Sequence, residues 1–595
     1  IRRLPAVETL GSATVICSDK TGTLTRNELT ARTIALPGRD ILVEGVGYEP
    51  VGGFKQNGRD LAASEDEDLV RALRMALLCS DSTIHKSQDA WTVVGDPTEG
   101  ALVVAAAKAG LDQTAELRAH PRLDAIPFES EHRFMATLHR GRNGERVIVA
   151  KGAPERILEM CNSEKAGDEL RPLDKARWTE HIDELAAHGQ RVLAVAMKPA
   201  EPGQKHLDHD HMSDGFALLA MFGLVDPPRP EAVRAIEDCH RAGIVVKMIT
   251  GDHAKTARSI SQELGISTAN DGVMTGREID ETSDEDLRIK ADQVNVFART
   301  SPEHKLRLVQ ALQADGHVVA MTGDGVNDAP ALKRADIGVA MGRKGTEAAK
   351  EAAEMVLADD NFATIAAAVR EGRIVYDNLQ KTILYILPTN GGQAFTVIAA
   401  LLLGYTLPMT PVQILWVNMV TAVTLAIALA FEPAESDVMD RPPRKPDQPI
   451  LTPYGLWRIG LVSFLMVAGA LGLFAYDLAS EAPIEEARTA AVNTIVAVEI
   501  FYLFNARFLR AASLDVQAII GSRAVLIAIA LVLLLQAAFT YLPIMQVLFG
   551  TSGLDAVMWL RITSVGILVF LLIEIEKVLM RRLDHGTRSP LGKAG

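Results

Sequence analysis

The sequence is poor in cysteine and in aromatic residues. Only four of its 595 residues are cysteine, and Phe, Trp and Tyr together make up 5%. The cysteines lie far apart and form no CxxC pair, so the sequence indicates neither a disulfide framework nor a zinc site. The glycine-rich loop that ends in Gly-Lys-Ser/Thr is also absent, which excludes a Walker-type ATPase.

An excess of basic charge is absent too. The sequence has 61 Lys and Arg against 75 Asp and Glu, a net charge of −14, so a nucleic-acid partner is not indicated. The chain is too long for one hydrophobic core, and we expect several domains. It is polar and charged up to about residue 380, whereas long apolar runs dominate the remainder.

One stretch near the start, Cys-Ser-Asp-Lys-Thr-Gly-Thr-Leu-Thr, organises the rest of the chain. The β-branched run Ala13–Ile16 before it indicates a buried strand, and the Thr-Gly pair after Asp19 requires a tight turn. Asp19 should therefore lie at the carboxyl end of a parallel strand, where open α/β sheets carry out their chemistry. A carboxylate beside Lys20 and free backbone N–H groups can attack a phosphoryl group. An ordinary strand-to-turn Asp is the commoner alternative, and the unbroken string argues against it.

Short apolar strands alternate with helical patterns again from about residue 224, which is typical of a parallel sheet. We expect strands at Val245–Ile249, Val294–Phe297 and Val318–Met321. The sequence Thr-Gly-Asp after the first of these can hold phosphoryl oxygens as helix starts do. The sequence Gly-Asp-Gly-Val-Asn-Asp after the last supplies carboxylates suited to Mg²⁺.

These motifs resemble those of the P-type ATPases, in which the Asp of DKTGTLT is phosphorylated. The resemblance implies a multidomain α/β protein with an all-α membrane part. Its parts are a haloacid-dehalogenase-like (Rossmann-like) phosphorylation domain, an inserted α+β nucleotide-binding domain and a six-helix transmembrane bundle. The expected boundaries are 1–31 and 224–362 for the phosphorylation domain, 32–223 for the nucleotide-binding domain, and 363–595 for the stalk and bundle.

The resemblance also implies the site residues, with Mg²⁺ and ATP as cofactors. The catalytic positions are Asp19, Lys20, Thr21, Thr250, Gly251, Asp252, Lys305, Asn327 and Asp328, and the Mg²⁺ ligands are Asp19, Thr21 and Asp324. The nucleotide-binding positions are Thr98, Glu99, Phe128, Arg133, Lys151, Gly152 and Arg191.

Two of these positions have a reading of their own. Phe128 suits base stacking, which needs only an aromatic face, although core packing is equally compatible with the sequence. Thr21 stands where related hydrolases place a second Asp as general acid/base, and Thr cannot take that role at neutral pH. The phosphorylated Asp should therefore hydrolyse slowly, as an energy-coupled pump requires.

Six apolar segments in succession predict a membrane bundle, because each is close to the ~20 residues that a spanning helix needs. They lie at residues 383–404, 411–431, 456–476, 489–506, 523–543 and 557–578. Basic residues such as Lys381, Arg444 and Arg507 fall on one side, which predicts that the catalytic domains are cytoplasmic.

Polar residues inside these segments are costly and predict the path of a transported ion. They are Asn390, Gln393, Asn418, Thr421 and Glu499. Simple hydrogen bonds between helices are the alternative at each position taken singly. The pattern resembles a calcium-transporting, type II pump, but Gln393 replaces a Glu and Ala422 replaces an Asp of that family. Because calcium affinity follows ligand charge, one Ca²⁺ or a monovalent ion such as Na⁺ or K⁺ both remain open.

In the resembling family four helices and an actuator domain with a TGES loop precede the phosphorylation loop. No apolar segment precedes Asp19 and no TGES occurs in the sequence. We therefore expect a C-terminal portion that needs the missing N-terminal portion as a partner and does not complete a transport cycle alone.

The predicted function is ATP-driven cation transport in a bacterial-type plasma membrane. Export of Ca²⁺ from the cytosol is the first prediction, and transport of a monovalent cation is the alternative. The predicted partners are ATP, the cation and membrane lipid. A membrane-anchored Mg²⁺-dependent phosphatase and a non-transporting nucleotide-binding protein are the alternatives of a different class.

Overall fold

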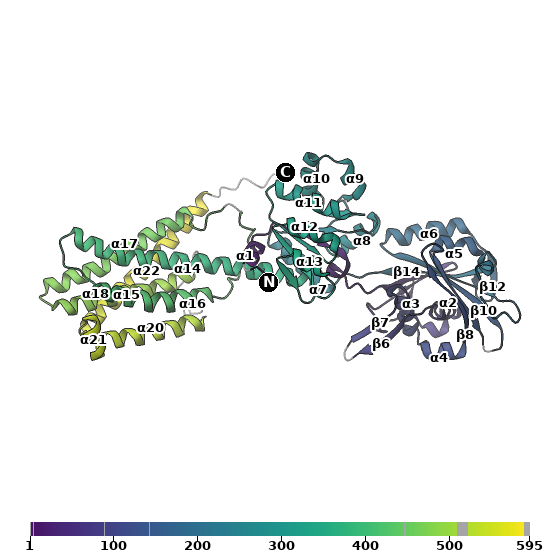
Figure 1. The fold of residues 1–595 in the computed structure, drawn as a ribbon, viewed down its shortest axis with the longest axis horizontal. Helices are drawn as coiled ribbons and strands as arrows, with labels where there is room; N and C mark the ends of the chain where they lie inside the picture. The colour runs from purple at the N-terminus through teal and green to yellow at the C-terminus, as the bar shows by residue number, and fades with distance from the viewer. Residues whose placement is uncertain are drawn as a thin grey trace. The chain divides into compact units, whose positions relative to one another are not determined.

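The computed structural model of the protein describes residues 2–3, 5–87, 90–141, 143–445, 448–508 and 522–587. The chain divides into two compact units, Ile1–Ala368 and Val369–Gly595 (Figure 1). The first unit holds two large sheets and their helices, and the second is helical.

One sheet of the first unit has seven strands, all parallel, in the order β16-β17-β15-β1-β18-β19-β20. Its strands are β1 (Val15–Asp19), β15 (Val245–Ile249), β16 (Val273–Thr275), β17 (Val296–Ala298), β18 (Val319–Gly323), β19 (Ile337–Met341) and β20 (Met355–Leu357). The predicted parallel sheet is confirmed, although β1 starts later than the predicted strand and includes Asp19 itself. The sheet is therefore assembled from segments more than 200 residues apart in the sequence.

Helices with one apolar face cover this sheet. α7 buries Ala232, Ala235, Ile236 and Cys239, the i, i+3, i+4, i+7 spacing of an amphipathic helix. The helices are α1 (Pro5–Gly11), α7 (Pro230–Arg241), α8 (Ala254–Glu263), α9 (Gly276–Glu281), α10 (Asp284–Gln293), α11 (Pro302–Ala314), α12 (Ala329–Arg334) and α13 (Glu347–Ala352). A turn, η1 (Lys20–Leu24), follows β1, and a short 3-10 helix, η4 (Val326–Asp328), precedes α12.

A second, eleven-stranded sheet is built from the segment between β1 and α7. Its main path is β5-β4-β3-β2-β14-β13-β10-β9-β8, and β11 pairs with β12 and β14. These strands are β2 (Thr30–Leu36), β3 (Arg39–Val43), β4 (Phe54–Gln56), β5 (Arg59–Leu61), β8 (Arg122–Glu129), β9 (Phe134–Arg140), β10 (Arg146–Gly152), β11 (Cys161–Ala166), β12 (Glu169–Pro172), β13 (Arg191–Pro199) and β14 (Phe216–Val225). A separate hairpin joins β6 (Thr83–Ser87) to β7 (Ala90–Val94).

Each face of the second sheet has its own core, because successive side chains of a strand point to opposite faces. Val149 of β10 lies in the core under α2 and α3, whereas its neighbours Ile148 and Ala150 lie in the core under α5 and α6. The helices are α2 (Glu67–Leu78), α3 (Pro97–Lys108), α4 (Gln113–Ala119), α5 (Pro154–Met160) and α6 (Lys175–Ala187), with short 3-10 helices η2 (Ala63–Glu65) and η3 (His209–Met212).

The second unit consists of helices (Figure 1). They are α14 (Phe362–Leu402), which begins in the first unit, α15 (Pro411–Val417), the π-helix η5 (Asn418–Ala426), α16 (Ile427–Ala430), α17 (Pro453–Ala479), α18 (Ile484–Arg507), α20 (Arg523–Tyr541), α21 (Pro543–Phe549) and α22 (Ala556–Thr587).

Among the described residues, five helical segments are long and apolar enough to cross a membrane. They are Pro411–Ala430, Pro453–Ala479, Ile484–Arg507, Arg523–Tyr541 and Ala556–Arg582. The remaining predicted span, residues 383–404, lies almost entirely in α14, which is not one of the five. The polar run Thr-Asn-Gly-Gly-Gln in the middle of that span lowers its mean hydropathy. Residues 446–447, 509–521 and 588–595 of the predicted membrane domain lie outside the described residues.

Candidate functional site

Asp19 is the last residue of β1, at the carboxyl edge of the parallel sheet. Its neighbour β18 runs in the same direction and ends at Gly323, so the loop after β18 lies at the same edge. The backbone N–H of Asp19 donates to the Thr322 hydroxyl at 3.1 Å, which ties the ends of the two strands together. The sequence motifs did not single out Thr322 for this role.

Lys305, in the first turn of α11, joins two carboxylates at this edge. Its ammonium lies 2.6 Å from Asp19 Oδ2 and 2.9 Å from Asp328 Oδ1. Burial lowers the pKa of Lys305, but the charges of Asp19 and Asp328 outweigh it and leave the pKa raised. Lys305 is therefore a fixed positive charge against the carboxylate that would carry a phosphoryl group.

The loop after β18 brings further carboxylates to the same place. Asp328 Oδ2 accepts from the backbone N–H groups of Asp324 and Gly325 at 3.2 and 3.1 Å. A Cβ on Gly323 would lie only 2.6 Å from Asp328 Cβ, so the close packing of this loop requires glycine at 323. Burial, and then the charges of Asp19 and Asp328, raise the pKa of Asp324.

The carboxylates of Asp19, Asp324 and Asp328 form a hard, oxygen-rich set that suits Mg²⁺. Lys305 is the basic group that contacts Asp19 and Asp328, and its single charge does not balance three carboxylates. Burial is the main cause of the raised pKa of Asp324, and the charges of Asp19 and Asp328 raise it further. A divalent cation would offset the excess of negative charge, so the residues present fit an Mg²⁺ site.

Thr250, Gly251 and Asp252 follow β15, the other neighbour of β1, and so reach the same edge. The buried Lys20 ammonium forms an ion pair with Asp252 Oδ2 at 2.6 Å. The Thr250 hydroxyl accepts from the backbone N–H of Asp252 at 3.1 Å and is buried. Gly251 is exposed, as are Thr21 and Asn327 among the other predicted catalytic positions.

The hinge sequence Asp-Pro-Pro-Arg holds the DKTGT turn. Thr25 Oγ1 donates to Asp226 Oδ2 at 2.6 Å, and the Arg229 guanidinium donates to the carbonyls of Thr25 and Gly22 at 3.0 and 3.2 Å. Gly22 adopts φ +78°, a left-handed conformation that favours glycine. Asp226 and Arg229 therefore set the shape of the turn beside Asp19.

The predicted nucleotide-binding residues fall into two groups. Lys151 Nζ lies 2.7 Å from Glu99 Oε1 and 3.3 Å from Ser80 Oγ, so the buried lysine and the first turn of α3 form one polar cluster. Thr98 lies beside Glu99 in that turn, where its N–H donates to Asp96 at 2.7 Å.

The second group lies where β8, β9 and β10 end together. Gly152 pairs with Phe134, which also pairs with Glu129 beside Phe128. A Cβ on Gly152 would lie 2.4 Å from the carbonyl of Arg133, so this close approach requires glycine. The Phe128 side chain is 59% exposed, so it does not pack in the core. Arg191, the first residue of β13, is exposed, and no side-chain contact with the described residues of either group is present.

In the second unit, Gln393 of α14 and Glu499 of α18 meet inside the bundle. Gln393 Nε2 donates to Glu499 Oε1 at 2.9 Å, and both side chains are buried. Gln393 Oε1 and Glu499 Oε2 have no hydrogen-bond partner among the described residues. Two unpaired, buried oxygens on a pair of hydrogen-bonded side chains are suited to a cation.

The other three predicted ion ligands differ from one another in burial. The buried Thr421 hydroxyl lies beside the Glu499 carboxylate and donates to the carbonyl of Val417 at 2.9 Å. Asn418 is half-buried, and Asn390 is exposed although it lies one turn from Gln393. The side chain of Ala422 lies outside the part of the structure that is described.

A side chain of another helix replaces a backbone hydrogen bond that is missing from α14, the helix that carries Gln393. Pro388 has no N–H to bond the carbonyl of Leu384, and α14 nevertheless continues through it. The hydroxyl of Tyr502 in α18 donates to that carbonyl at 2.7 Å. The same two helices that supply Gln393 and Glu499 are thus also joined by Tyr502, which lies one turn from Glu499.

Comparison with known proteins identifies the family. A model of the C-terminus of cation-transporting ATPases matches residues 406–579, a model of cytoplasmic domain N of P-type ATPases matches residues 68–231, and two models of haloacid dehalogenase-like hydrolases match residues 162–333 and 303–369.

Among curated relatives, the probable cation-transporting ATPase F of Mycobacterium tuberculosis is 47% identical over 98% of this chain and 65% of its own length. The calcium-transporting ATPase of Bacillus subtilis is 40% identical over 85% of this chain and 57% of its own. The endoplasmic reticulum calcium ATPase srcA of Aspergillus fumigatus is 35% identical over 98% of this chain and 68% of its own.

The chain belongs to the P-type cation-transporting ATPases. It is an integral membrane protein with a haloacid-dehalogenase-like domain. It spans 65% of the length of the mycobacterial relative and 57% of the Bacillus one.

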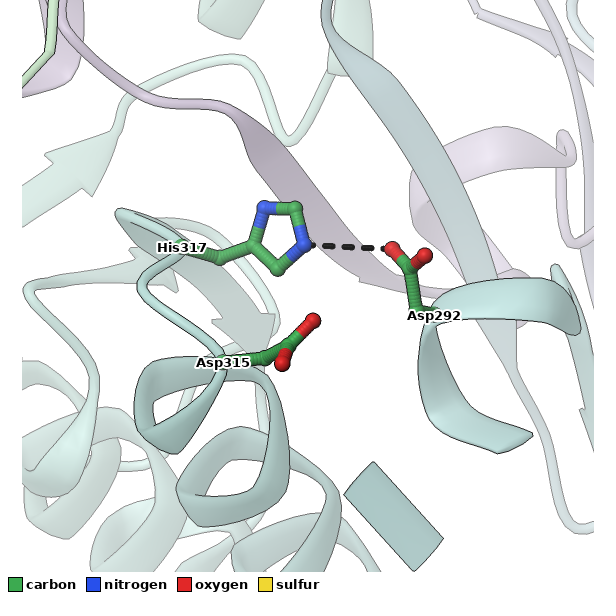
Figure 2. Close-up of side chains that lie close together, drawn as sticks. All are labelled: Asp292, Asp315 and His317. Atoms are coloured by element: carbon green, nitrogen blue, oxygen red, sulfur yellow. Dashed lines mark hydrogen bonds and ion pairs between the residues drawn. The ribbon is translucent and has the colours of Figure 1, made fainter. Parts of the chain in front are cut away.

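A further group of metal-binding residue types lies at the opposite, amino edge of the seven-stranded sheet. Figure 2 shows Asp292, Asp315 and His317, whose ligand atoms lie within 4.8 Å of one another. His317 is already bonded on both ring nitrogens, to Thr14 at 2.9 Å and to Asp292 at 3.1 Å. These contacts account for the imidazole without a metal ion, so we assign the group a structural role.

Proposed function

We propose that this chain is the catalytic and membrane portion of an ATP-driven cation pump that forms an aspartyl-phosphate on Asp19. The position of Asp19 carries the proposal: its carboxylate stands at the open edge of a parallel sheet, 2.6 Å from Lys305 and among further carboxylates. The polar pair Gln393–Glu499 in the membrane unit supplies a place for a cargo.

The transfer step follows from the contacts of Asp19. Lys305 holds Oδ2 and leaves Oδ1 to attack the γ-phosphorus of ATP. A bond from Oδ1 to phosphorus forms, and the bond from phosphorus to the bridging oxygen breaks. ADP leaves with that oxygen and its electron pair. Lys305 and the N–H groups of the turn after Asp19 offset the negative charge that gathers on the phosphoryl oxygens.

Asp19, Asp324 and the loop that contains Thr21 would hold Mg²⁺. When bound, Mg²⁺ would neutralise charge on the transferred phosphoryl group. Thr250 and Gly251 stand at the same edge to orient the phosphoryl oxygens, and Asp252 positions Lys20 through their ion pair.

ATP would be held by the inserted sheet. Phe128 offers an exposed aromatic face for the adenine, and Arg133 and Gly152 lie at the same end of the sheet. The Lys151–Glu99 cluster and Thr98 would contact the remainder of the nucleoside, and Arg191 is assigned here by the resemblance alone. We retain residues 32–223 as the nucleotide-binding domain and residues 1–31 with 224–362 as the phosphorylation domain.

The cargo that we propose is one Ca²⁺ per cycle, exported from the cytosol of a bacterial cell. The calcium-transporting relatives support this choice. The pair itself favours a second candidate, a monovalent cation such as Na⁺ or K⁺, because among the described residues Glu499 is the one carboxylate bonded to Gln393. Thr421 would complete either site, with Asn418 and Asn390 as further ligands.

Phosphoenzyme formation from labelled ATP in the full-length protein tests the proposal. The assay compares Ca²⁺, Na⁺, K⁺ and no added ion, with Asp19→Asn as the control. Labelling that requires micromolar Ca²⁺ would support calcium, and labelling that requires only a monovalent ion would support the second candidate. Acid-stable labelling that survives Asp19→Asn would refute the mechanism.

A further inference from the structure

A chain of hydrogen-bonded polar residues, linked through side chains and backbone carbonyls, runs through the membrane unit separately from the Gln393–Glu499 pair. It links the loop before α22 to α18, α20 and α15. Its members, in spatial order, are Ser552, Thr489, Asn493, Thr540, Gln536 and Trp416. None of them belongs to the catalytic, nucleotide or cation sites described above.

The contacts along the chain are short and continuous. The N–H of Ser552 donates to Thr489 Oγ1 at 2.9 Å. The Asn493 amide donates to the carbonyl of Thr489 at 2.9 Å and to Thr540 Oγ1 at 3.1 Å. Thr540 Oγ1 donates to the carbonyl of Gln536 at 2.9 Å, and the Trp416 indole donates to Gln536 Oε1 at 3.4 Å.

Two polar atoms of the chain have no partner. Asn493 Oδ1 and Gln536 Nε2 make no hydrogen bond with any described residue. Asn493 is 2% exposed and Gln536 is 3% exposed, so these groups do not lie at the surface of the bundle. A buried polar group without a partner costs free energy, and helix-to-helix bonding alone would not leave such atoms behind.

The unpaired atoms are one acceptor and one donor, and both belong to neutral amides. A cation would be attracted by Asn493 Oδ1 but repelled by the amide N–H groups of Gln536. Water both donates and accepts, and buried waters typically satisfy such groups. The chemistry of the pair therefore selects water rather than a second ion.

We propose that Asn493 and Gln536 bind buried water, and that this chain is a hydrated path from the outer surface into the bundle. The path ends at Trp416, two residues before the π-helix η5 that carries Asn418 and Thr421. The word "outer" rests on the proposed orientation, in which the catalytic domains are cytoplasmic. The path would allow water to reach the neighbourhood of the ion site from the side opposite to ATP.

The distribution of cysteine makes the proposal testable. All four native cysteines lie in the first unit, at residues 17, 79, 161 and 239, and all are buried. A cysteine introduced into residues 369–595 is therefore the one thiol of that segment. The test variants are Asn493→Cys, Thr540→Cys and Gln536→Cys.

Two matched controls place a cysteine in the apolar core of the same helices. Val496 lies in α18, three residues from Asn493, and is 2% exposed. Val532 lies in α20, four residues from Gln536, and is 0% exposed. Val496→Cys and Val532→Cys place a cysteine at positions that are as buried as the test positions but lack their polar neighbours.

The probe is Ag⁺, which is small enough for a water-sized path and binds thiols. It is added outside intact cells that produce the full-length protein. After washing, the protein is denatured and its remaining thiols are labelled with a fluorescent maleimide, with the parent as background. We expect Ag⁺ to block labelling of the test cysteines at least about tenfold faster than the controls.

Three results would overturn the path. In the first, the test cysteines of monodisperse protein react no faster than the controls. In the second, the control cysteines react as fast as the test cysteines. In the third, the test cysteines react only when Ag⁺ is added to the cytoplasmic face of inverted vesicles. Phosphoenzyme formation by the parent is measured in the same preparations. Its failure would refute the proposed pump while leaving the thiol result to decide the path.

Discussion

The site around Asp19 and the Gln393–Glu499 pair differ in how their charged and polar groups are paired. At the edge, Lys305 bridges Asp19 and Asp328, and Asp328 accepts two further backbone N–H groups. In the membrane unit, Gln393 and Glu499 share one hydrogen bond and each keeps an unpaired oxygen. The first arrangement is largely assembled before its substrate arrives, whereas the second is completed only by its ligand.

This difference matches the two tasks that we propose. Electrostatic stabilisation of a transition state requires groups that are held in place beforehand. A transported ion must be bound and then released. A site whose polar groups are left unpaired without the ion can bind it and let it dissociate again. The predictions that follow change one side of this comparison at a time.

The largest effect is expected for Asp19→Asn. The amide is a poor nucleophile, so phosphoenzyme formation should fall below detection while the cation site is unchanged. Acid-precipitated protein labelled from γ-labelled ATP measures the loss. Asp315→Asn, in the same domain and without a contact to Asp19, serves as the control and should retain labelling.

Lys305→Met tests whether the edge depends on its bridging cation. Removing the ammonium leaves two carboxylates without their partner, so the phosphorylation rate should fall about 100- to 1,000-fold. Loss of one partner of a buried ion pair should also lower the free energy of unfolding by about 3–5 kcal/mol. Rapid-quench labelling and thermal unfolding measure the two effects. Lys333→Met, at an exposed position of α12, should change neither.

Phe128→Ala separates adenine binding from packing. Loss of a stacked base costs about 1–3 kcal/mol, so ATP should bind about 5- to 150-fold more weakly with little change in stability. Phe128→Trp should restore binding. The control is Phe134→Ala, which empties a 1% exposed core position and should lower stability by about 3–5 kcal/mol. Equal destabilisation by both variants would contradict the assignment of Phe128.

Gln393→Glu sharpens the membrane half of the comparison. A second carboxylate beside Glu499 should increase the apparent Ca²⁺ affinity for phosphorylation about tenfold or more. Without the cation, two neighbouring buried carboxylates should lower thermal stability. Calcium titration of phosphoenzyme formation gives the affinity, with Gln380→Glu in the same helix as the control. An unchanged calcium dependence would remove Gln393 from the ion site.

The smallest effect is expected from Mg²⁺ itself. The folded-state pKa of Asp324 is raised, so its contribution to stability is present below its ordinary value of 3.8 and is lost as pH rises through the raised pKa. At neutral pH its charge therefore costs stability, and Mg²⁺ at ten times its Kd should restore about 1.4 kcal/mol. Differential scanning fluorimetry measures this gain. Asp324→Asn should raise stability without Mg²⁺ and abolish the response to it.

Much of the catalytic edge could be predicted from local sequence. Asp19 and Asp324 each follow a short apolar strand, and parallel strands bring their carboxyl ends to one edge. The hydroxyl of Thr322 could not be assigned in this way, because its contact with Asp19 joins residues 303 positions apart. Local patterns carry no information on such a contact.

The membrane unit was harder to predict for the same reason. Hydropathy located the helices, and the predicted span in α14, with Asn390 and Gln393 inside it, is not among the five apolar segments of the described residues. Hydropathy also gave no sign that Asn390 would be exposed while Gln393 is buried. Which face of an apolar helix meets a neighbour depends on packing, and hydropathy averages over all faces.

Pro388 and Tyr502 act on the same backbone carbonyl, that of Leu384. The proline removes the helix bond to the Leu384 carbonyl, and the tyrosine hydroxyl replaces it from another helix. A relative with alanine at the first position would have no use for the hydroxyl, and one with phenylalanine at the second would leave a carbonyl stranded. The two positions are therefore coupled in structure, and a change at one alters what the other contributes.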